Sequence, residues 1–176
     1  DLEALTREAE LSDDLLARAS ALRRRLIELG ITKYNLARSA PLPQTSRQRI
    51  LVPGQVEGDQ SLRFGSPEVQ ENAELLRRVR ARHPEAFILY KPHPDVLTGL
   101  RPGAVDEATL AACSDAVVTD CAAEACLEWA DRVECMTSLM GFEALLRDLP
   151  VTTFGRPFYA GWGLTETPSD PAFSRG

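Results

Sequence analysis

The sequence lacks the excess of basic residues that a nucleic-acid-binding domain carries. Its 20 lysines and arginines stand against 26 aspartates and glutamates, so the formal net charge at pH 7 is −6. Binding to nucleic acid requires a basic face on the domain. We therefore expect no nucleic-acid partner.

Long apolar runs are also missing, although 44% of the residues are hydrophobic. No stretch approaches the roughly 20 apolar residues that span a bilayer, and the chain does not open on a signal or transit peptide. The first residue is Asp1 rather than methionine. We expect the chain to be a fragment of a longer protein.

Cysteine is present without the spacing of a metal or redox site. The four cysteines match no zinc-binding pattern and form no C-x-x-C pair. Each lies in or beside an apolar segment: Cys113, Cys121, Cys126 and Cys135. We expect buried, reduced thiols in a cytoplasmic protein, and no metal site. The two standard glycine-rich phosphate loops, G-x-G-x-x-G and the P-loop, are absent as well, so a bound nucleotide would be held in another way.

Short apolar segments alternate with helical patterns along the chain. The expected strands cover residues 49–54, 86–90, 116–119, 132–136 and 151–154. The expected helices cover residues 12–29, 107–113 and 122–130, together with one that begins at Ser66-Pro67-Glu68 and one that passes through residues 142–146. Alternation with short connections is typical of a parallel sheet with helices on both faces. We predict an α/β, Rossmann-like fold.

The N-terminal part differs from the rest. Leucines recur at helical spacing over residues 12–29, and residues 23–25 are a run of arginines near the end of this helix. The run could contact anionic lipid head groups or form a solvated helix face. A proline-containing link follows at residues 39–49. We therefore divide the chain into a helical segment and linker, residues 1–40, and a lobe that holds the sheet, residues 41–176.

Polar residues follow three of the expected strands. His93 lies between two prolines at the end of one strand, Asp59 lies in a polar loop after another, and Thr137 and Ser138 follow a third. The carboxyl ends of parallel strands share one edge of the sheet, where α/β proteins bind ligands. We expect these residues to converge on one ligand.

Each of these features has a plainer alternative. The Pro-His-Pro turn could be only a rigid connection, and Asp59 could be only a helix cap. Thr137 and Ser138 could bind an anion at a helix N-terminus or merely cap it. Glu143, in the same helix, could reach a ribose hydroxyl or face solvent. The aromatic loop at residues 155–165 could pack a base or sugar, or close the sheet edge. His83 is expected to end a helix.

Four stretches, in order, resemble signatures of the bacterial capsule polysaccharide biosynthesis family. They are QVEGDQSLRFGSP at 55–67, YKPHPDV at 90–96, MTSLMGFEALLR at 136–147 and PFYAGWGLT at 157–165. The chain looks like one module of the KpsC-type β-Kdo transferases. It resembles their carboxyl-terminal lobe, which binds the donor nucleotide.

The resemblance implies a retaining glycosyltransferase of GT-B architecture that uses CMP-Kdo and needs no cofactor or metal. By motif, Asp59 would be the carboxylate nucleophile. The residues implied for the donor are His93 and Lys91 at the phosphate or the Kdo carboxylate, Thr137 and Ser138 at the phosphate, Glu143 at the ribose, and Gln55 and Arg63 at the sugar. One departure is Gly58, which stands where the common motif has an acid.

The resemblance also implies partners and a location. The family builds the poly-Kdo linker of capsular polysaccharide on a phosphatidylglycerol-type lipid, on the cytoplasmic face of the inner membrane, and an N-terminal GT-B lobe should complete the enzyme. Two other functions stay open for this chain. It could be a non-catalytic nucleotide-binding or assembly module, or a sialyltransferase-like enzyme that uses another CMP-sugar.

Overall fold

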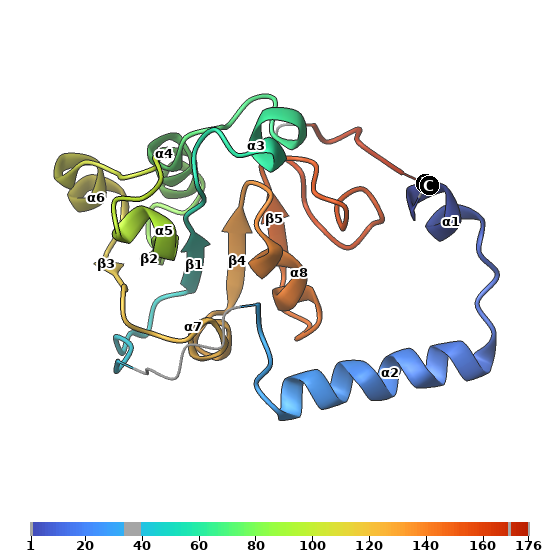
Figure 1. Cartoon of the computed structure of the whole chain (residues 1–176). Helices are drawn as coiled ribbons and strands as arrows, with labels where there is room; N and C mark the ends of the chain where they lie inside the picture. Colours follow the sequence, from blue (N-terminus) through green and yellow to red (C-terminus); the bar gives the residue numbers. More distant parts are fainter. Residues whose placement is uncertain (1, 34–39, 169, 176) are drawn as a thin grey trace.

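The computed structural model describes residues 2–33, 40–168 and 170–175 and has the predicted α/β architecture (Figure 1). A five-stranded sheet has the order β3-β2-β1-β4-β5, and every strand pair is parallel. The strands are β1 (Arg49–Pro53), β2 (Phe87–Lys91), β3 (Ala116–Val117), β4 (Arg132–Cys135) and β5 (Val151–Thr153). Each observed strand overlaps a segment that the apolar pattern predicted.

Helices cover both faces of this sheet. The helices found in the described residues are α1 (Leu2–Glu8), α2 (Asp13–Glu28), α3 (Gln60–Gly65), α4 (Asn72–Arg82), α5 (Pro94–Leu97), α6 (Glu107–Cys113), α7 (Ala123–Trp129) and α8 (Leu139–Leu145). Helices α1 and α2 lie away from the sheet (Figure 1). Alternate side chains of β1 enter different cores, because successive strand residues point to opposite faces. Ile50 and Val52 pack with residues of α4, whereas Leu51 packs with residues of α7 and α8.

The strand order reverses beside β1. The chain runs from β1 outward to β2 and β3 on one side, and then returns to place β4 and β5 on the other side (Figure 1). Such a reversal leaves a crevice outside the carboxyl ends of the two central strands, and open α/β sheets bind ligands there. The fold therefore directs attention to the ends of β1 and β4.

The helix predicted to begin at Ser66 is wrong in its start. Helix α4 begins at Asn72, and the hydroxyl of Ser66 donates a hydrogen bond to the carbonyl of Val69. A capping hydroxyl would instead accept a bond from an amide of the first turn. Ser66 thus closes a tight turn, and Val69 is buried in the core without belonging to the helix.

Three helices were not predicted: α1, α3 and α5. Helix α3 occupies part of the stretch expected to be an irregular polar loop, and Asp59 is its N-cap. Helix α5 follows the Pro-His-Pro turn directly, with His93 as its N-cap. Both are short helices of four to six residues, which show too little periodicity for a pattern to indicate.

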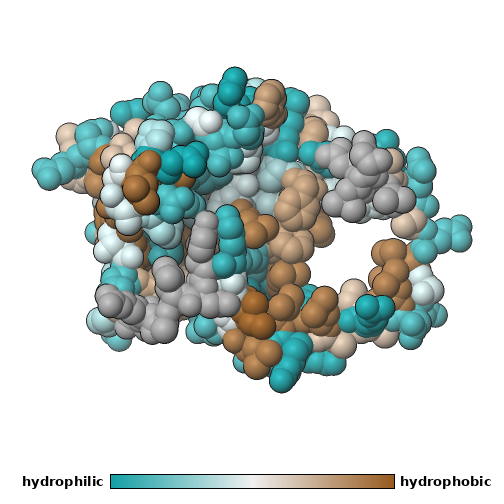
Figure 2. Space-filling view, viewed as in Figure 1, coloured by the Kyte–Doolittle hydropathy of each residue, from teal (hydrophilic) through white to brown (hydrophobic). Residues whose placement is uncertain are grey.

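Helix α2 forms as predicted but does not pack its leucines on the sheet. Ser12 caps it, none of its residues is buried, and Leu22 is 60% exposed. Apolar side chains gather along this helix in Figure 2. Its attachment is polar: Arg23 donates from Nε to the carbonyl of Leu146 at 2.6 Å and pairs with Asp148. Within the arginine run, Arg23 therefore contacts the part of the chain that holds the sheet, and Arg25 pairs with Glu28 of the same helix at 3.6 Å.

The link between α2 and the sheet is described only in part. Residues 34–39, including the predicted start of the link at Ser39, lie outside the described residues. From residue 40 the chain has no regular structure until β1, and the indole of Trp129 donates to the carbonyl of Pro43 at 2.8 Å. The division of the chain at residue 40 stays a prediction.

A buried carboxylate joins β4 to the end of α4. Glu134 is fully buried, and its Oε1 lies 2.5 Å from Nε2 of His83, the C-cap of α4. Arg132 and Arg82 supply positive charge to the same carboxylate. His83 is thus a helix-terminal structural residue, as predicted.

All four cysteines are buried and unpaired, as predicted. Burial raises the pKa of the Cys126 thiol to about 12 and that of Cys135 to about 11. Thiols with such pKa values are inert nucleophiles, so we assign them to the core.

Of the described helices, none is long and apolar enough to cross a membrane.

Candidate functional site

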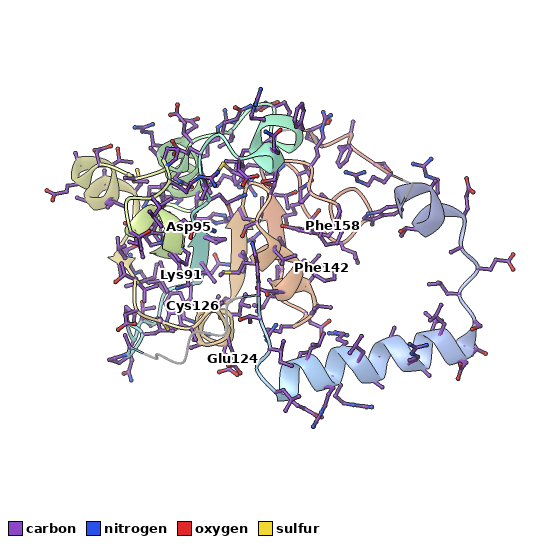
Figure 3. All side chains as sticks on the ribbon, viewed as in Figure 1. Lys91, Asp95, Glu124, Cys126, Phe142 and Phe158 are labelled. Carbon is purple, nitrogen blue, oxygen red and sulfur yellow. The ribbon has the colours of Figure 1, made fainter. Side chains whose placement is uncertain are left out.

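A cavity of about 550 Å³ lies at the carboxyl edge of the sheet. This volume is within the range of roughly 300–1,000 Å³ that is usual for small-molecule sites. The predicted residues that line it are Gln55, Asp59, Lys91, His93, Thr137, Ser138 and Glu143. The expected convergence of the three strand ends is therefore found. In Figure 3, Lys91 and Asp95 mark the β2 and α5 side, and Phe158 marks the β5 side.

Gln55 ties together the two strands at the reversal point. Its Nε2 donates to Oγ1 of Thr137 at 2.9 Å, and its Oε1 accepts from the backbone amide of Thr137 at 2.8 Å. The side chain is 8% exposed, so water competes little for these bonds. The carboxyl ends of β1 and β4 are held at a fixed separation by this amide.

Asp59 caps helix α3 and lines the cavity at the same time. Its Oδ1 accepts a hydrogen bond from the backbone amide of Ser61 at 3.0 Å. This bond lowers the pKa of Asp59, and the charges of Arg101 and Lys33 lower it further. The carboxylate is ionised at neutral pH, which is the form that a nucleophile requires.

His93 is braced by the turn that the two prolines form. Its Nδ1 accepts from the backbone amide of Asp95 at 3.2 Å, so the neutral ring carries its proton on Nε2. Burial lowers the pKa of this ring, which keeps it neutral at pH 7. The geometry provides an uncharged N–H donor at the end of β2.

Thr137 and Ser138 both make internal bonds. Thr137 bonds to Gln55, as described above, and Ser138 caps α8 by accepting from the amide of Met140 at 3.2 Å. The capping alternative therefore holds for Ser138. A role for either residue at a phosphate stays a prediction.

Lys91 is a buried lysine at the end of β2. Its Nζ donates to the carbonyl of Cys121 at 2.7 Å, and the residue is 8% exposed. The ammonium group lines the cavity, yet one of its three donors is fixed to the protein. Its positive charge lies at the surface of the cavity, where it can attract an anionic group.

Glu143 does not face solvent. It is 8% exposed, and its Oε1 accepts from the backbone amide of Lys33 at 2.6 Å. Burial raises the pKa of this carboxyl, although the amide bond and the charge of Arg147 oppose the shift. Glu143 therefore anchors the segment that follows α2 against the cavity.

Replacing Glu143 with glutamine is expected to raise the unfolding midpoint at pH 8. Because the folded state has the higher pKa, it binds the proton more tightly, and stability falls as pH rises from the unfolded value of 4.5 through the raised value. Glutamine stays neutral and still accepts from Lys33. Thermal melts between pH 4 and 8 should show the two midpoints converging at acidic pH. A pH-independent difference between the proteins would contradict the raised pKa.

The aromatic loop at residues 155–165 packs on α8. Phe158 lies 5.1 Å from Phe142, ring centre to ring centre (Figure 3), and the hydroxyl of Tyr159 donates to the carbonyl of Ser138 at 2.5 Å. A Cβ at Gly141 would lie 2.2 Å from that hydroxyl, so position 141 must be glycine for the Tyr159 ring to pack here. Tyr159 is buried, whereas Phe158 is half exposed and lines the cavity. The loop thus packs against the end of the sheet, and one of its rings lines the cavity; a contact of that ring with a base or sugar stays a prediction.

Asn72 supports the site from behind. It is fully buried, and its side chain accepts from the amide of Gln55 at 2.9 Å and donates to the carbonyls of Gln55 at 2.8 Å and Gly103 at 2.9 Å. Its own amide donates to Glu57 at 2.9 Å. One side chain therefore connects the loop before Asp59 with the turn that carries Arg101. No pattern in the sequence indicates this role for Asn72.

Two cations of the cavity were missed, and one predicted residue lies elsewhere. Lys33 and Arg101 line the cavity, although neither belongs to a recognised motif. Arg63 is not among the lining residues; it is exposed, with its guanidinium 5.8 Å from the ring of Phe64. One signal could have indicated Lys33: the chain has net negative charge and only two lysines, and both Lys33 and Lys91 lie next to expected strand ends or links.

Within the part of the chain that the structure describes, no group of three or more histidine, cysteine, aspartate or glutamate residues is arranged to hold a metal ion. The expectation that the donor site works without a metal stays a prediction.

An open parallel sheet with a polar cavity at its reversal point defines an α/β lobe of the kind that binds ligands at that position. The chain matches the capsule polysaccharide biosynthesis protein family over residues 10–174, and it belongs to this family. This confirms the resemblance that the four motifs indicated.

Curated relatives and solved structures support the same assignment. The chain is 46% identical over 166 residues to the capsule polysaccharide modification protein LipA of Neisseria meningitidis serogroup B, which covers 94% of this chain and 24% of LipA. It is 38% identical over 170 residues to the lipopolysaccharide-processing protein LpsZ of Rhizobium meliloti, covering 94% of this chain and 39% of LpsZ.

Two of the similar solved structures are Kdo transferases. The KpsC β-Kdo 2,7 transferase of Thermosulfurimonas dismutans aligns with a TM-score of 0.80 and 36% identity, over 99% of this chain and 52% of that chain. The KpsC β-Kdo 2,4 transferase of the same organism aligns with a TM-score of 0.77 and 30% identity, over 94% and 53%. The fold is therefore that of a KpsC lobe. The chain spans about a quarter of LipA and about half of each transferase structure.

Proposed function

We propose that this chain is the donor-binding lobe of a retaining β-Kdo glycosyltransferase that uses CMP-Kdo. One observation carries the proposal: the cavity at the reversal of strand order contains an ionised carboxylate, Asp59, and a neutral histidine, His93. The likeness to KpsC transferases over 99% of the chain supports the choice of donor.

The proposed chemistry is a double displacement. A carboxylate oxygen of Asp59 bonds to the anomeric carbon of Kdo while the bond from that carbon to the phosphate oxygen breaks. CMP leaves with the electron pair, and a glycosyl-enzyme ester remains. A hydroxyl of the acceptor then displaces Asp59, its proton passing to a base outside the residues assigned here, and the original anomeric configuration is restored.

The donor would be held by residues from three strand ends. The Nε2–H group of His93 would donate to the phosphate, with Ser138 and Thr137 beside it, and Lys91 would add positive charge from the wall. A carboxylate oxygen of Glu143 would accept from a ribose hydroxyl. Stabilising the charge on departing CMP with donors of this kind needs no metal ion.

The proposal includes partners that are not part of this chain. The acceptor would be a phosphatidylglycerol-type lipid at the cytoplasmic face of the inner membrane, on which the enzyme would build the poly-Kdo linker of capsular polysaccharide. A second, N-terminal GT-B lobe would face the cavity and supply the acceptor site.

Titration calorimetry of the chain tests the proposal with three ligands: CMP, freshly prepared CMP-Kdo and CMP-sialic acid. We expect CMP and CMP-Kdo to bind, and CMP-sialic acid to bind more weakly than CMP-Kdo. UDP-glucose serves as the control nucleotide sugar and should give no heat beyond dilution.

Three results would redirect the assignment. A preference for CMP-sialic acid would favour a sialyltransferase-like enzyme. Binding of CMP without any chemical change in CMP-Kdo would favour a non-catalytic nucleotide-binding module. Absence of CMP binding would remove the roles given to His93, Thr137 and Ser138.

A further inference from the structure

The cations of the cavity divide into two kinds. Lys91 is buried and donates to a backbone carbonyl, whereas Lys33 and Arg101 are exposed residues that line the cavity. These two come from segments far apart in the chain, one after α2 and one after α5. Two independent segments thus bring positive charge to one place.

Each of the two backbones is anchored to an element of the site. The amide of Lys33 donates to Glu143 at 2.6 Å. The amide of Arg101 donates to the carbonyl of Asp95 at 3.1 Å, and the next residue, Pro102, accepts from the amide of Glu57 at 3.0 Å. The cations are therefore held by the same segments that carry His93, Asp59 and Glu143.

Gly103 holds the second anchor in place. Its φ of 132° lies in a region that favours glycine, and a Cβ there would lie 2.8 Å from the carbonyl oxygen of Gln55. The turn that carries Arg101 must therefore approach the end of β1 closely. This contact holds the turn that carries Arg101 against the end of β1, and Arg101 lines the same cavity as Asp59.

Both cations act on Asp59 and His93. After the amide of Ser61, the charges of Arg101 and Lys33 lower the pKa of Asp59, and after burial, the same charges lower the pKa of His93. Both cations line the cavity together with Asp59 and His93, so their positive charge acts on the space that these two side chains share. An anionic ligand group beside Asp59 would lie in this field.

A donor whose sugar is an acid presents a particular problem to a carboxylate nucleophile. In a ulosonic acid such as Kdo, the carboxylate is attached to the anomeric carbon, so it must come close to Asp59 as the new bond forms. Two like charges at this distance repel strongly where water is displaced. A fixed pair of cations beside the nucleophile removes the repulsion and orients the sugar.

We propose that Lys33 and Arg101 form a carboxylate-binding pair that selects nucleotide donors carrying an acid group at the anomeric carbon. The assignment rests on the proposed function and extends it to the residues that recognise the sugar. It takes the place of the sugar contact predicted for Arg63, which lies outside the cavity.

The test uses three variants of the chain, Lys33→Met, Arg101→Met and the double variant, with Arg77→Met as control. Arg77 lies on α4, where it pairs with Glu74 at 3.7 Å, outside the cavity lining. Calorimetry with CMP and CMP-Kdo separates the phosphate from the sugar carboxylate, because CMP contains only the phosphate. Lys33→Arg tests whether positive charge is sufficient.

Each single variant should weaken CMP-Kdo binding about 10-fold, the effect of losing one charge-assisted hydrogen bond. CMP binding should stay within about twofold of the parent, as should both ligands with Arg77→Met, and Lys33→Arg should restore most of the loss. Equal losses for CMP and CMP-Kdo would assign the pair to the phosphate and overturn the proposal. Unchanged CMP-Kdo binding would also overturn it, with the donor site itself intact. A parent chain that binds neither ligand would instead remove the proposed function on which the pair depends.

Discussion

Asp59→Asn is expected to abolish the covalent Kdo adduct and to lower any transfer at least about 1,000-fold, as expected for loss of a nucleophile. The amide of asparagine is a poor nucleophile, but its side-chain oxygen still accepts from the amide of Ser61. Because asparagine and aspartate are similarly good N-caps, helix α3 should persist. Intact-mass measurement after incubation with CMP-Kdo should show a gain of one Kdo residue on the parent chain and none on the Asp59→Asn variant. The adduct should map to the peptide that contains Asp59.

The matched control for this experiment is Asp106→Asn. Asp106 caps α6 as Asp59 caps α3, accepting from the amide of Thr109 at 2.8 Å, but it does not line the cavity. This variant should form the adduct at the parental rate. An adduct on Asp59→Asn would identify a different nucleophile. No adduct on the parent, with CMP still bound, would favour a binding module.

Asn72→Ala is expected to lower the free energy of unfolding by about 3 kcal/mol, since one buried side chain satisfies three backbone groups that would otherwise lack partners. For a chain of this length, such a loss corresponds to a fall of roughly 6–12 °C in the unfolding midpoint. Thermal and urea melts measure it directly. Donor affinity at a temperature where the variant is folded should also fall, because Asn72 joins the loops that carry Asp59 and Arg101.

Gln70→Ala provides the comparison for Asn72. Gln70 lies two residues earlier and is exposed, so its loss should change the unfolding free energy by less than about 0.5 kcal/mol. If Asn72→Ala were as mild as this control, ordered water would have to replace the lost bonds. The amide would then not be the element that holds the two loops together.

The sheet was predictable because its signals are local. Strands of a parallel sheet are buried on both faces, so they appear in the sequence as continuous apolar runs such as Ile50-Leu51-Val52, without polar residues at alternate positions. The start of α4 was not predictable from Ser66-Pro67-Glu68. Whether a serine accepts a bond from a helix amide or donates to a nearby carbonyl depends on where the chain must go next, and burial of Val69 decides it here.

Half of the site followed from the sheet, and half did not. Asp59, His93, Thr137 and Ser138 lie within a few residues of predicted strand ends, so parallel topology alone brings them to one edge. The segments of Lys33 and Arg101 are placed by backbone bonds to Glu143 and Asp95, which no spacing encodes. The motif predicts Arg63 as a sugar contact instead, yet Arg63 lies on α3 and is not among the residues that line the cavity.

The amide clamp between Gln55 and Thr137 has a consequence for how the protein assembles. The two residues are 82 positions apart in the chain, and they meet only after β4 has docked beside β1. Closing so long a loop is entropically unfavourable, and non-local pairing of this kind slows folding. A nascent chain that has completed only β1, β2 and β3 therefore lacks the part of the cavity that Thr137 and Ser138 form. The ability to hold a ligand should arise late and in one step, with the arrival of β4, and not grow gradually as the polypeptide lengthens.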